Sequence, residues 1–320
     1  MIVVTGAAGF IGSVIVKLLN DRGEDVVIAD CLGSEGKYRN LRRRRISRIV
    51  TPERLLSDLE TGSLRPTAII HMGAITDTSE PNADLLLEQN TQYTERLTRL
   101  ALGKEIRLIY ASSASVYGDG DLGFSDTNDL TSVLCPLNPY AFSKWLFDAT
   151  AIRMGWDKEI VGLRFFNVYG PNEYHKGSMA SVVWHAYNQL KNTDSIQLFK
   201  SHNPEYADGE QKRDFIYVDD VARVVLWFLY HPEVNGIFNL GTGKARSYKD
   251  VAEALFYAVE RKPNIEYIPT PESIRPSYQY FTEADISKLK SVGCDVPFHN
   301  LEDGVEDYVR NYLAKTNNYL

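Results

Sequence analysis

A glycine-rich turn near the start of the chain constrains the fold more than any other segment. Gly6, Gly9 and Gly12 are spaced G-x-x-G-x-x-G, directly after an apolar run at 2–5 and before a helical apolar pattern at 10–21. In that setting the first glycine permits a tight turn, the second lets backbone approach a pyrophosphate, and the third lets the helix pack on the strand. The free N–H groups of the helix N-terminus would face the phosphates. The alternative is a structural turn in another α/β fold.

Strand and helix patterns alternate along the first half of the chain and loosen after residue 170. We expect strands at 26–30, 68–71, 107–110, 160–165, 196–199 and 236–240, and helices at 85–102, 140–154, 178–190, 218–230 and 301–313. Repeated βα units predict an α/β protein with a doubly wound parallel sheet, the Rossmann fold. We therefore expect a dinucleotide-binding domain over 1–170, to which 210–242 partly return, and a smaller C-terminal α/β substrate lobe over 171–320.

The choice between NAD and NADP turns on the residues after the second expected strand. Asp30 ends that strand, where an acid binds the adenosine ribose hydroxyls and favours NAD. Lys37 and Arg39 follow closely and could hold a ribose phosphate, which favours NADP. Asp30 could also cap the next turn. The residues themselves leave both cofactors open.

Tyr140 and Lys144 form a second pattern that carries chemistry. They are four residues apart on an expected helix and so share one face. A lysine ammonium there can stabilise a phenolate, which would let the tyrosine act as a base at neutral pH. Ser113 follows the strand expected at 107–110, at the sheet edge that faces ligands, and could hydrogen-bond the same oxygen. The alternative is a core tyrosine beside a surface lysine. With the glycine turn present, we interpret the group as a site for hydride transfer at a carbinol.

Lys176 is a further candidate, in a loop expected to emerge beside the ligand crevice. A loop lysine is most often solvated, but this loop leads into a helix N-terminus, which is a natural anion site.

We interpret the arginine run at 42–45 as a solvated charged face. The alternative is that it supplies a positive electrostatic field near a cofactor phosphate or forms a subunit contact.

Several classes of function are disfavoured by composition. The net charge of −7 disfavours general nucleic-acid binding. No apolar stretch is long enough to span a bilayer, and the first residues lead straight into the glycine turn, so we expect no membrane association and no signal peptide. The histidines and the 3 cysteines lack metal-ligand spacing, so we expect no metal site and a reducing, cytoplasmic location.

Motifs in a fixed order resemble the extended short-chain dehydrogenase/reductases over nearly the whole chain. They are Thr5-Gly6-x-x-Gly9-x-x-Gly12, ASSASVYG at 111–118, Tyr140-x-x-x-Lys144, RFFNVYGP at 164–171 and RDFIYVDD at 213–220. More narrowly, 175–182, 236–243 and 278–285 resemble the ADP-L-glycero-D-manno-heptose 6-epimerases. The resemblance implies an NADP-dependent isomerase that acts on ADP-heptose, the donor for the lipopolysaccharide inner core, and that forms a homo-oligomer, often a pentamer.

The resemblance also implies roles for individual residues. The two acid/base groups fall on Tyr140 and Lys176, the cofactor-binding lysine on Lys144, and the serine at the reacting oxygen on Ser113. The implied cofactor set, besides the three glycines, is Phe10, Ile11, Asp30, Cys31, Lys37, Met72, Gly73, Ala74, Ile75, Thr76, Asn90, Lys144, Val168 and Lys176. The implied substrate set is Ser113, Asn167, Ser178, His185, Phe199, Lys200, Ser201, His202, Arg213 and Tyr278.

The chain departs from the family pattern in two places. Cys31 stands where an amide or other polar residue is common, and the segment between Phe199 and Arg213 is several residues longer. Alternative functions are another nucleotide-sugar epimerase or dehydratase, such as a UDP-sugar 4-epimerase, and a non-catalytic dinucleotide-binding regulator. A dehydratase usually needs an acid pair after the serine motif, which is lacking beside Ser113. The intact Tyr140, Lys144 and Ser113 disfavour the regulator.

Overall fold

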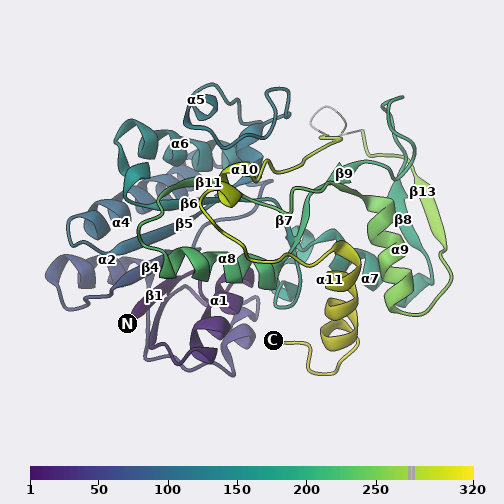
Figure 1. Cartoon of the computed structure of the whole chain (residues 1–320). Helices are drawn as coiled ribbons and strands as arrows, with labels where there is room; N and C mark the ends of the chain where they lie inside the picture. Colours follow the sequence, from purple (N-terminus) through teal and green to yellow (C-terminus); the bar gives the residue numbers. More distant parts are fainter. Residues whose placement is uncertain (273–274, 276–277) are drawn as a thin grey trace.

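A parallel sheet dominates the computed structural model, which describes residues 1–272, 275 and 278–320 (Figure 1). Within these residues the sheet has 7 strands in the order β11-β6-β5-β4-β1-β2-β3. The strands are β1 (Ile2–Thr5), β2 (Val26–Ala29), β3 (Arg48–Val50), β4 (Ala68–His71), β5 (Arg107–Ser113), β6 (Val161–Phe165) and β11 (Gly236–Leu240). The strand order reverses between β1 and β4, and the carboxyl ends at such a switch point form the ligand crevice of doubly wound sheets. The predicted fold class is confirmed.

Helices cover both faces of this sheet because alternate side chains of each strand point to opposite sides. Ile2 and Val4 of β1 pack in a core with α1 (Phe10–Asp21) and α8 (Val218–Tyr230). Val3, between them, packs in a second core with α2 (Pro52–Thr61), α4 (Tyr93–Leu102) and α6 (Pro139–Arg153). These strands are buried on both faces, which explains why they read as continuous apolar runs.

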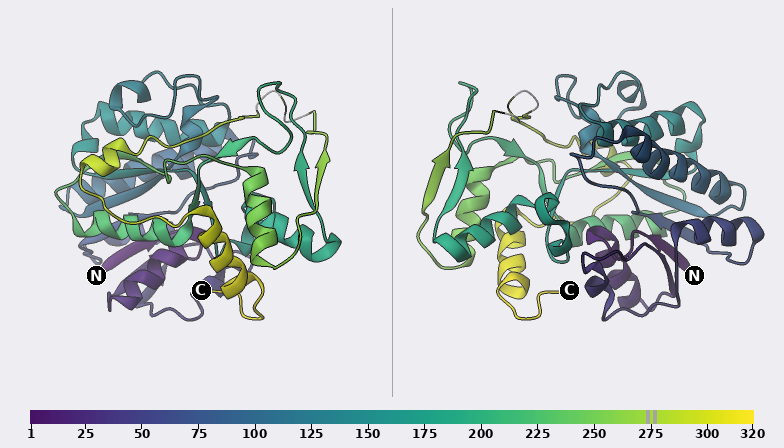
Figure 2. Two further views of the ribbon diagram at one scale, coloured as in Figure 1. Left: turned by 45° about the vertical axis from the view of Figure 1, so that its right-hand side comes forward. Right: turned by 180° about the vertical axis from the view of Figure 1, so that it is seen from behind.

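A third core lies beside the sheet and is built mainly by residues after 168 (Figure 2). It contains α7 (Val182–Thr193), α9 (Tyr248–Ala258) and α11 (Leu301–Tyr308), with β8 (Ile196–Phe199) paired to β13 (Ile265–Ile268). Two further short ladders form separate two-stranded sheets: β7 (Asn167–Tyr169) with β10 (Phe215–Tyr217), and β9 (Lys212–Arg213) with β12 (Arg246–Ser247). In contrast to these elements, α8 packs on the seven-stranded sheet and β11 is one of its strands. The division at residue 170 with a returning 210–242 segment stays our proposal.

Shorter elements complete the chain. They are α3 (Ala83–Leu86), α5 (Asn128–Thr131), α10 (Ser287–Ser291), the 3₁₀ turns η1 (Lys37–Leu41), η3 (Ala114–Tyr117), η4 (Trp156–Lys158) and η5 (Tyr174–Met179), and the π turns η2 (Leu87–Gln92) and η7 (Val309–Leu313). Among the helices of the described residues, none is long and apolar enough to cross a membrane.

The helix expected at 178–190 is displaced in the structure. Gly177 has φ 54 and breaks the helical geometry within η5, and α7 begins only at Val182. Ser181 caps it, because its side chain accepts a hydrogen bond from the backbone N–H of Trp184. The strand expected at 107–110 is also longer than predicted and includes Ser113.

Candidate active site

A cavity of about 920 Å³ lies at the carboxyl ends of the sheet strands and borders the third core. The predicted residues that line it are Gly6, Gly9, Phe10, Ile11, Gly12, Asp30, Cys31, Lys37, Met72, Gly73, Ala74, Ile75, Thr76, Ser113, Tyr140, Lys144, Asn167, Val168, Lys176 and Ser178. The predicted residues outside its lining are Asn90, His185, Phe199, Lys200, Ser201, His202, Arg213 and Tyr278. The fold therefore brings the predicted reacting groups and most of the predicted cofactor set to one cavity.

The glycine turn has the backbone geometry that its spacing predicts. Gly6 has φ +61, and a Cβ there would lie 2.6 Å from the Gly73 backbone nitrogen. A Cβ on Gly12 would lie 2.2 Å from the Gly6 carbonyl oxygen, so only glycine permits this approach of helix and turn. Gly9 is the N-cap of α1 and supplies no side chain to the first N–H groups. These N–H groups face the cavity through Phe10, Ile11 and Gly12, which fits a bound pyrophosphate.

Asp30 is held from both sides at the end of β2. One carboxylate oxygen accepts from the Ala8 backbone N–H at 2.7 Å, and the other accepts from the Lys37 ammonium at 2.7 Å. The Asp30 side chain is 5% exposed and that of Lys37 is 22% exposed. A cation and an anion thus stand together on the cavity wall where an adenosine ribose would lie.

Two buried polar groups position the loop after β4. His71 lies between the hydroxyl of Thr5, 2.6 Å from Nδ1, and that of Thr94, 2.9 Å from Nε2. Burial, helped by the charge of Lys144, lowers the pKa of His71 to about 3, so this ring is neutral. Asn90, although outside the lining, accepts from the Ile75 N–H at 2.9 Å and donates to the Ile75 carbonyl at 3.0 Å. Asn90 therefore fixes the backbone of Ile75, which lines the cavity.

Tyr140, Lys144 and Ser113 meet where α6 packs on β5. Tyr140 is 9% exposed and Lys144 is 6% exposed. Burial raises the pKa of Tyr140, and a hydrogen bond with Ser113 acts in the opposite direction. We predicted that the Lys144 ammonium would lower the Tyr140 pKa. Instead, Lys144 Nζ donates to the Ala111 carbonyl oxygen at 3.0 Å, and burial dominates at the tyrosine.

The charge of Lys144 is itself adjusted by its surroundings. Burial lowers the pKa of Lys144 to about 8, and the carboxylate of Asp148, one helical turn further along α6, partly offsets this. Asp148 is fully buried and binds Arg164 of β6, with Nε donating to Oδ2 at 2.9 Å. The face of α6 that carries the predicted reacting groups is thus fixed to the sheet by a buried ion pair.

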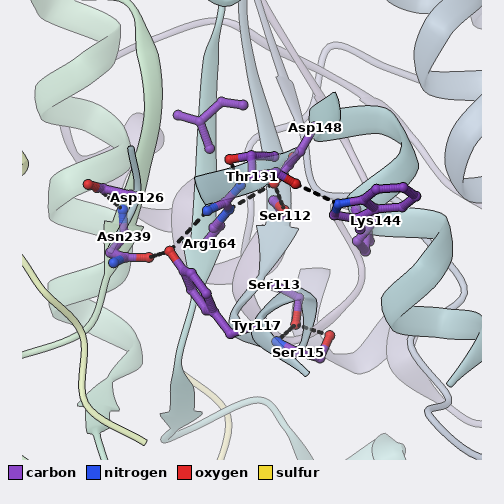
Figure 3. Close-up of polar contacts among 12 residues, drawn as sticks. Ser112, Ser113, Ser115, Tyr117, Asp126, Thr131, Lys144, Asp148, Arg164 and Asn239 are labelled. Carbon is purple, nitrogen blue, oxygen red and sulfur yellow. Dashed lines mark hydrogen bonds and ion pairs between the residues drawn. The ribbon is translucent and has the colours of Figure 1, made fainter. Parts of the chain in front are cut away.

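A wider polar network surrounds this ion pair (Figure 3). Arg164 also donates to the hydroxyls of Tyr117 at 2.9 Å and Thr131 at 2.8 Å. Asp148 also accepts, at 2.9 Å, from the hydroxyl of Ser112, which is the residue next to Ser113. On its other side Tyr117 donates to Asn239 of β11 at 2.7 Å. The network joins β5, α6, β6 and β11, and it holds the end of β5 that presents Ser113.

Lys176 lies on η5, on the side of the cavity formed by the third core. Its Nζ is 3.4 Å from the hydroxyl of Thr76, on the loop after β4. Burial lowers the pKa of Lys176, and the carboxylates of Glu173 and Asp77 act in the opposite direction. Glu173 is fully buried, accepts from the Ser181 hydroxyl at 2.7 Å, and has its pKa raised to about 6 by burial. The candidate lysine is therefore half-buried and directed to the same cavity as Tyr140 and Ser113.

Four of the predicted substrate residues form an aromatic cluster in the third-core region: Phe199, His202, Arg213 and Tyr278. The Arg213 guanidinium lies over Tyr278, 5.7 Å from the ring centroid, and over Tyr248 at 5.8 Å. Tyr278 also contacts Phe199 and His202 edge to face. Tyr248 lines the cavity, so the cluster borders it through this ring. The cluster could close on the distal part of a nucleotide.

The other predicted substrate residues lie around these groups. The Lys200 N–H donates to the Ile268 carbonyl of β13 at 2.7 Å, and the Ser201 N–H donates to Asp208 Oδ1 of the same loop at 2.8 Å. His185 on α7 has Nε2 3.3 Å from the carbonyl of Ser178. Some of the hydrogen-bonding groups of segment 200–212 are therefore paired within the segment itself.

Sequence reasoning missed several residues of this site. Glu173 and His175, both shortly before the predicted Lys176, line the cavity, as do Asp77 and Tyr248. Asn172 is fully buried with φ 77, a left-handed conformation that asparagine tolerates. Its place after the Gly170-Pro171 turn was a readable sign, because an asparagine there suits a tight bend. The described residues contain no group of three histidine, cysteine or acidic side chains that could hold a metal ion.

The chain is similar to known epimerases in family, sequence and structure. Residues 2–241 match the model of the NAD-dependent epimerase/dehydratase family. The chain is 49% identical, over 323 residues and 100% of both chains, to the ADP-L-glycero-D-manno-heptose-6-epimerase of Nitratidesulfovibrio vulgaris. The crystal structure of the Helicobacter pylori enzyme of the same name is 29% identical, with a TM-score of 0.79, over 97% of this chain and 95% of that one. The Thermus thermophilus UDP-glucose 4-epimerase in complex with NAD is 27% identical, with a TM-score of 0.75, over 96% and 97%.

Proposed function

The chain belongs to the NAD-dependent epimerase/dehydratase family, and from that premise we propose that it inverts C6 of an ADP-linked glycero-manno-heptose. The reaction would pass through a transient ketone and supply heptose for lipopolysaccharide core synthesis. The observation that carries the proposal is that Lys176 lines the same cavity as Tyr140, Ser113 and Lys144. The full-length identity of 49% to a heptose epimerase supports the substrate, whereas a shared fold alone would not.

A bound nicotinamide dinucleotide would supply hydride acceptance and return next to the substrate carbinol. The chain's own residues that would hold it are the N–H groups at the start of α1 for the pyrophosphate and the Asp30–Lys37 pair for the ribose. Lys144 would bind the cofactor from α6, as the family resemblance implies. Val168 and the loop from Met72 to Thr76 would complete the wall around the nicotinamide.

The two acid/base groups have different duties in this proposal. Tyr140 would exchange a proton with the C6 oxygen in one orientation of the exocyclic group, while Ser113 holds that oxygen. After the ketone turns to present its opposite face, its oxygen lies elsewhere, and Lys176 would exchange the proton there. A single group cannot reach the oxygen in both orientations, which is the geometric reason for two. Burial lowers the pKa of Lys176, so it can exchange a proton more readily near neutral pH.

We propose NADP as the cofactor that this chain prefers. The ammonium of Lys37 lies on the cavity wall beside Asp30 and could bind a 2′-phosphate. A purely NAD-directed site would present the acid without a cation. We also propose a cytoplasmic homo-oligomer, a pentamer by family resemblance, which light scattering of the purified protein would test.

The substrate is tested by incubating the purified protein with ADP-D-glycero-D-manno-heptose, UDP-glucose and UDP-N-acetylglucosamine separately and following each by NMR. We expect inversion at C6 of the heptose and no C4 inversion of either UDP-sugar. Inversion of a UDP-sugar with no change in the heptose would transfer the assignment to a 4-epimerase. Nicotinamide absorbance in the freshly purified protein is expected as well, since an epimerase has no net redox change and need not release its cofactor.

A further inference from the structure

The last residues of the chain return to the active-site half of the molecule. After α11 and η7 the chain reverses, and its C-terminus lies next to α1 in all views (Figures 1 and 2). Residues 318–320 are half-buried there, and Leu320 packs against the core shared by α1 and α8. We refer to residues 317–320 as the C-terminal strap.

One side of the strap contacts the arginine run at 42–45. Arg44 donates from its guanidinium to the backbone oxygen of Leu320. The Arg42 guanidinium lies 5.2 Å from the centre of the Tyr319 ring, and Arg43 lies against the amide of Asn317. Arg45 instead turns to the end of α1, donating to the Asn20 carbonyl at 2.5 Å. Three of the four arginines therefore bind the strap, which gives this run a local partner.

The other side of the strap contacts the segment that leads to Lys176. The Leu320 backbone N–H donates to Asn172 Oδ1 at 3.0 Å. The Tyr174 hydroxyl donates to the Asn318 carbonyl, and the Tyr174 and Tyr319 rings meet edge to face with centroids 5.2 Å apart. Each of the two positions, 172 and 174, thus has its own contact with the strap.

Asn172 connects these contacts to the glycine turn. Its side-chain nitrogen donates to Ser13 Oγ on α1 at 3.0 Å, while its carbonyl accepts from Asn40 at 3.1 Å. Asn40 also donates to the Ala8 carbonyl at 2.9 Å. Both asparagines are buried, so each lost contact would leave a polar group without a partner. The segment is therefore fixed at 172–174, and Lys176 follows two residues later, with its N–H donating to the Glu173 carbonyl at 2.9 Å.

We propose that the C-terminal strap positions Lys176, with Asn172 and Tyr174 as the residues through which it acts. The inference rests on the proposed function, in which Lys176 exchanges a proton with the substrate. Gly177, with φ 54, follows Lys176 directly, and no residue of η5 is buried. The other side-chain contacts of residues 175–179 are long: 3.4 Å from Lys176 Nζ to Thr76, 3.5 Å from His175 Nδ1 to Asn40 and 3.6 Å from Met179 Sδ to Thr78. In this proposal the arginine run holds the strap against α1.

The test compares two lesions of different size. Tyr174→Phe removes the hydroxyl bond to Asn318 but keeps the ring, whereas a chain that ends after Thr316 removes every strap contact. Tyr257→Phe is the control, because Tyr257 is 67% exposed and lies outside the cavity lining. The first readout is the rate at which an amine-acylating reagent labels Lys176, measured by mass spectrometry relative to the exposed Lys104. The second is the kcat and KM of heptose epimerisation.

We expect Lys176 labelling to rise severalfold in Tyr174→Phe and about tenfold in the shortened chain, with Lys104 unchanged in both. We expect kcat to fall in the same order, by up to about 10²-fold, while KM changes little, because a small misplacement of a reacting group is costly. Labelling of Lys176 at the wild-type rate in both variants would overturn the strap proposal. Faster labelling with unchanged kcat would instead show that the strap orders the loop but that Lys176 takes no part in turnover, which contradicts the proposed function.

Discussion

Arg164 of β6 donates from Nε to Oδ2 of Asp148 on α6 at 2.9 Å, and neither side chain is exposed. The pair fixes the helix of Tyr140 and Lys144 to the sheet. Removing one partner leaves a buried charge, so Asp148→Asn and Arg164→Met should each lower the free energy of unfolding by about 3 kcal/mol. Urea unfolding measures this, and the double variant of Asp148→Asn with Arg164→Met should cost less than the sum of the two single losses. The exposed pair of Lys17 and Asp21 is the control, for which Lys17→Met should cost about 0–1 kcal/mol. Single-variant losses as small as this would refute the role of the ion pair.

Glu173 should give the protein a pH-dependent stability. Burial raises its folded-state pKa from 4.5 to about 6, so the folded protein holds this proton more tightly than the unfolded chain. The stabilisation is therefore complete below pH 4.5 and is lost as pH rises through about 6, with a size of about 2 kcal/mol. Stability curves of wild type and Glu173→Gln should diverge across this window, because the amide of the variant does not titrate and its curve lacks the decline. Parallel curves from pH 4 to 7 would contradict the prediction.

Lys37 should discriminate between the two nicotinamide cofactors. Lys37→Ala removes the ammonium beside Asp30 and should weaken NADP binding about 10-fold or more, with NAD little changed or improved. Isothermal titration with each cofactor measures both effects, and Lys104→Ala is the control for loss of a surface charge. An equal loss for NADP and NAD would argue against contact with a ribose phosphate.

Gly12 should tolerate no side chain. A Cβ would meet the Gly6 carbonyl oxygen at 2.2 Å, so Gly12→Ala must separate α1 from the turn. We expect loss of detectable cofactor binding together with a lower melting temperature, measured by fluorescence titration and thermal unfolding. Gly103→Ala, at a helix end with φ −65, should leave both properties near wild type. Normal cofactor affinity in Gly12→Ala would refute the assigned role of the turn.

The parallel sheet and the cavity could be predicted because both depend on local patterns. The apolar runs of β1, β4 and β5 and the glycine turn can each be recognised in the local sequence. A parallel sheet then brings the carboxyl ends of its strands to one edge, whatever the contacts between distant segments are. Helix α9 was missed although Ser247 and Asp250 form a capping box that marks its start. That element could have been found from sequence.

Other features could not be predicted, because they depend on contacts between distant segments. Nothing local in Lys144 indicates that its ammonium turns to the Ala111 carbonyl instead of lowering the Tyr140 pKa. The arginine run was interpreted as a solvated face, and Arg42, Arg43 and Arg45 are indeed exposed. Arg44 is half-buried, and its guanidinium donates to the backbone oxygen of Leu320, far along the chain. Such pairings follow from tertiary structure and not from spacing.

The central claim is that two groups, Tyr140 and Lys176, serve the two orientations of one ketone. It is tested most directly by the turnover of Lys176→Met on ADP-heptose, with Tyr140→Phe and wild type measured beside it and bound cofactor quantified by absorbance. We predict that each variant retains cofactor and loses about 10²–10⁴-fold in kcat. Near-normal epimerisation by Lys176→Met with cofactor bound would contradict the two-group account.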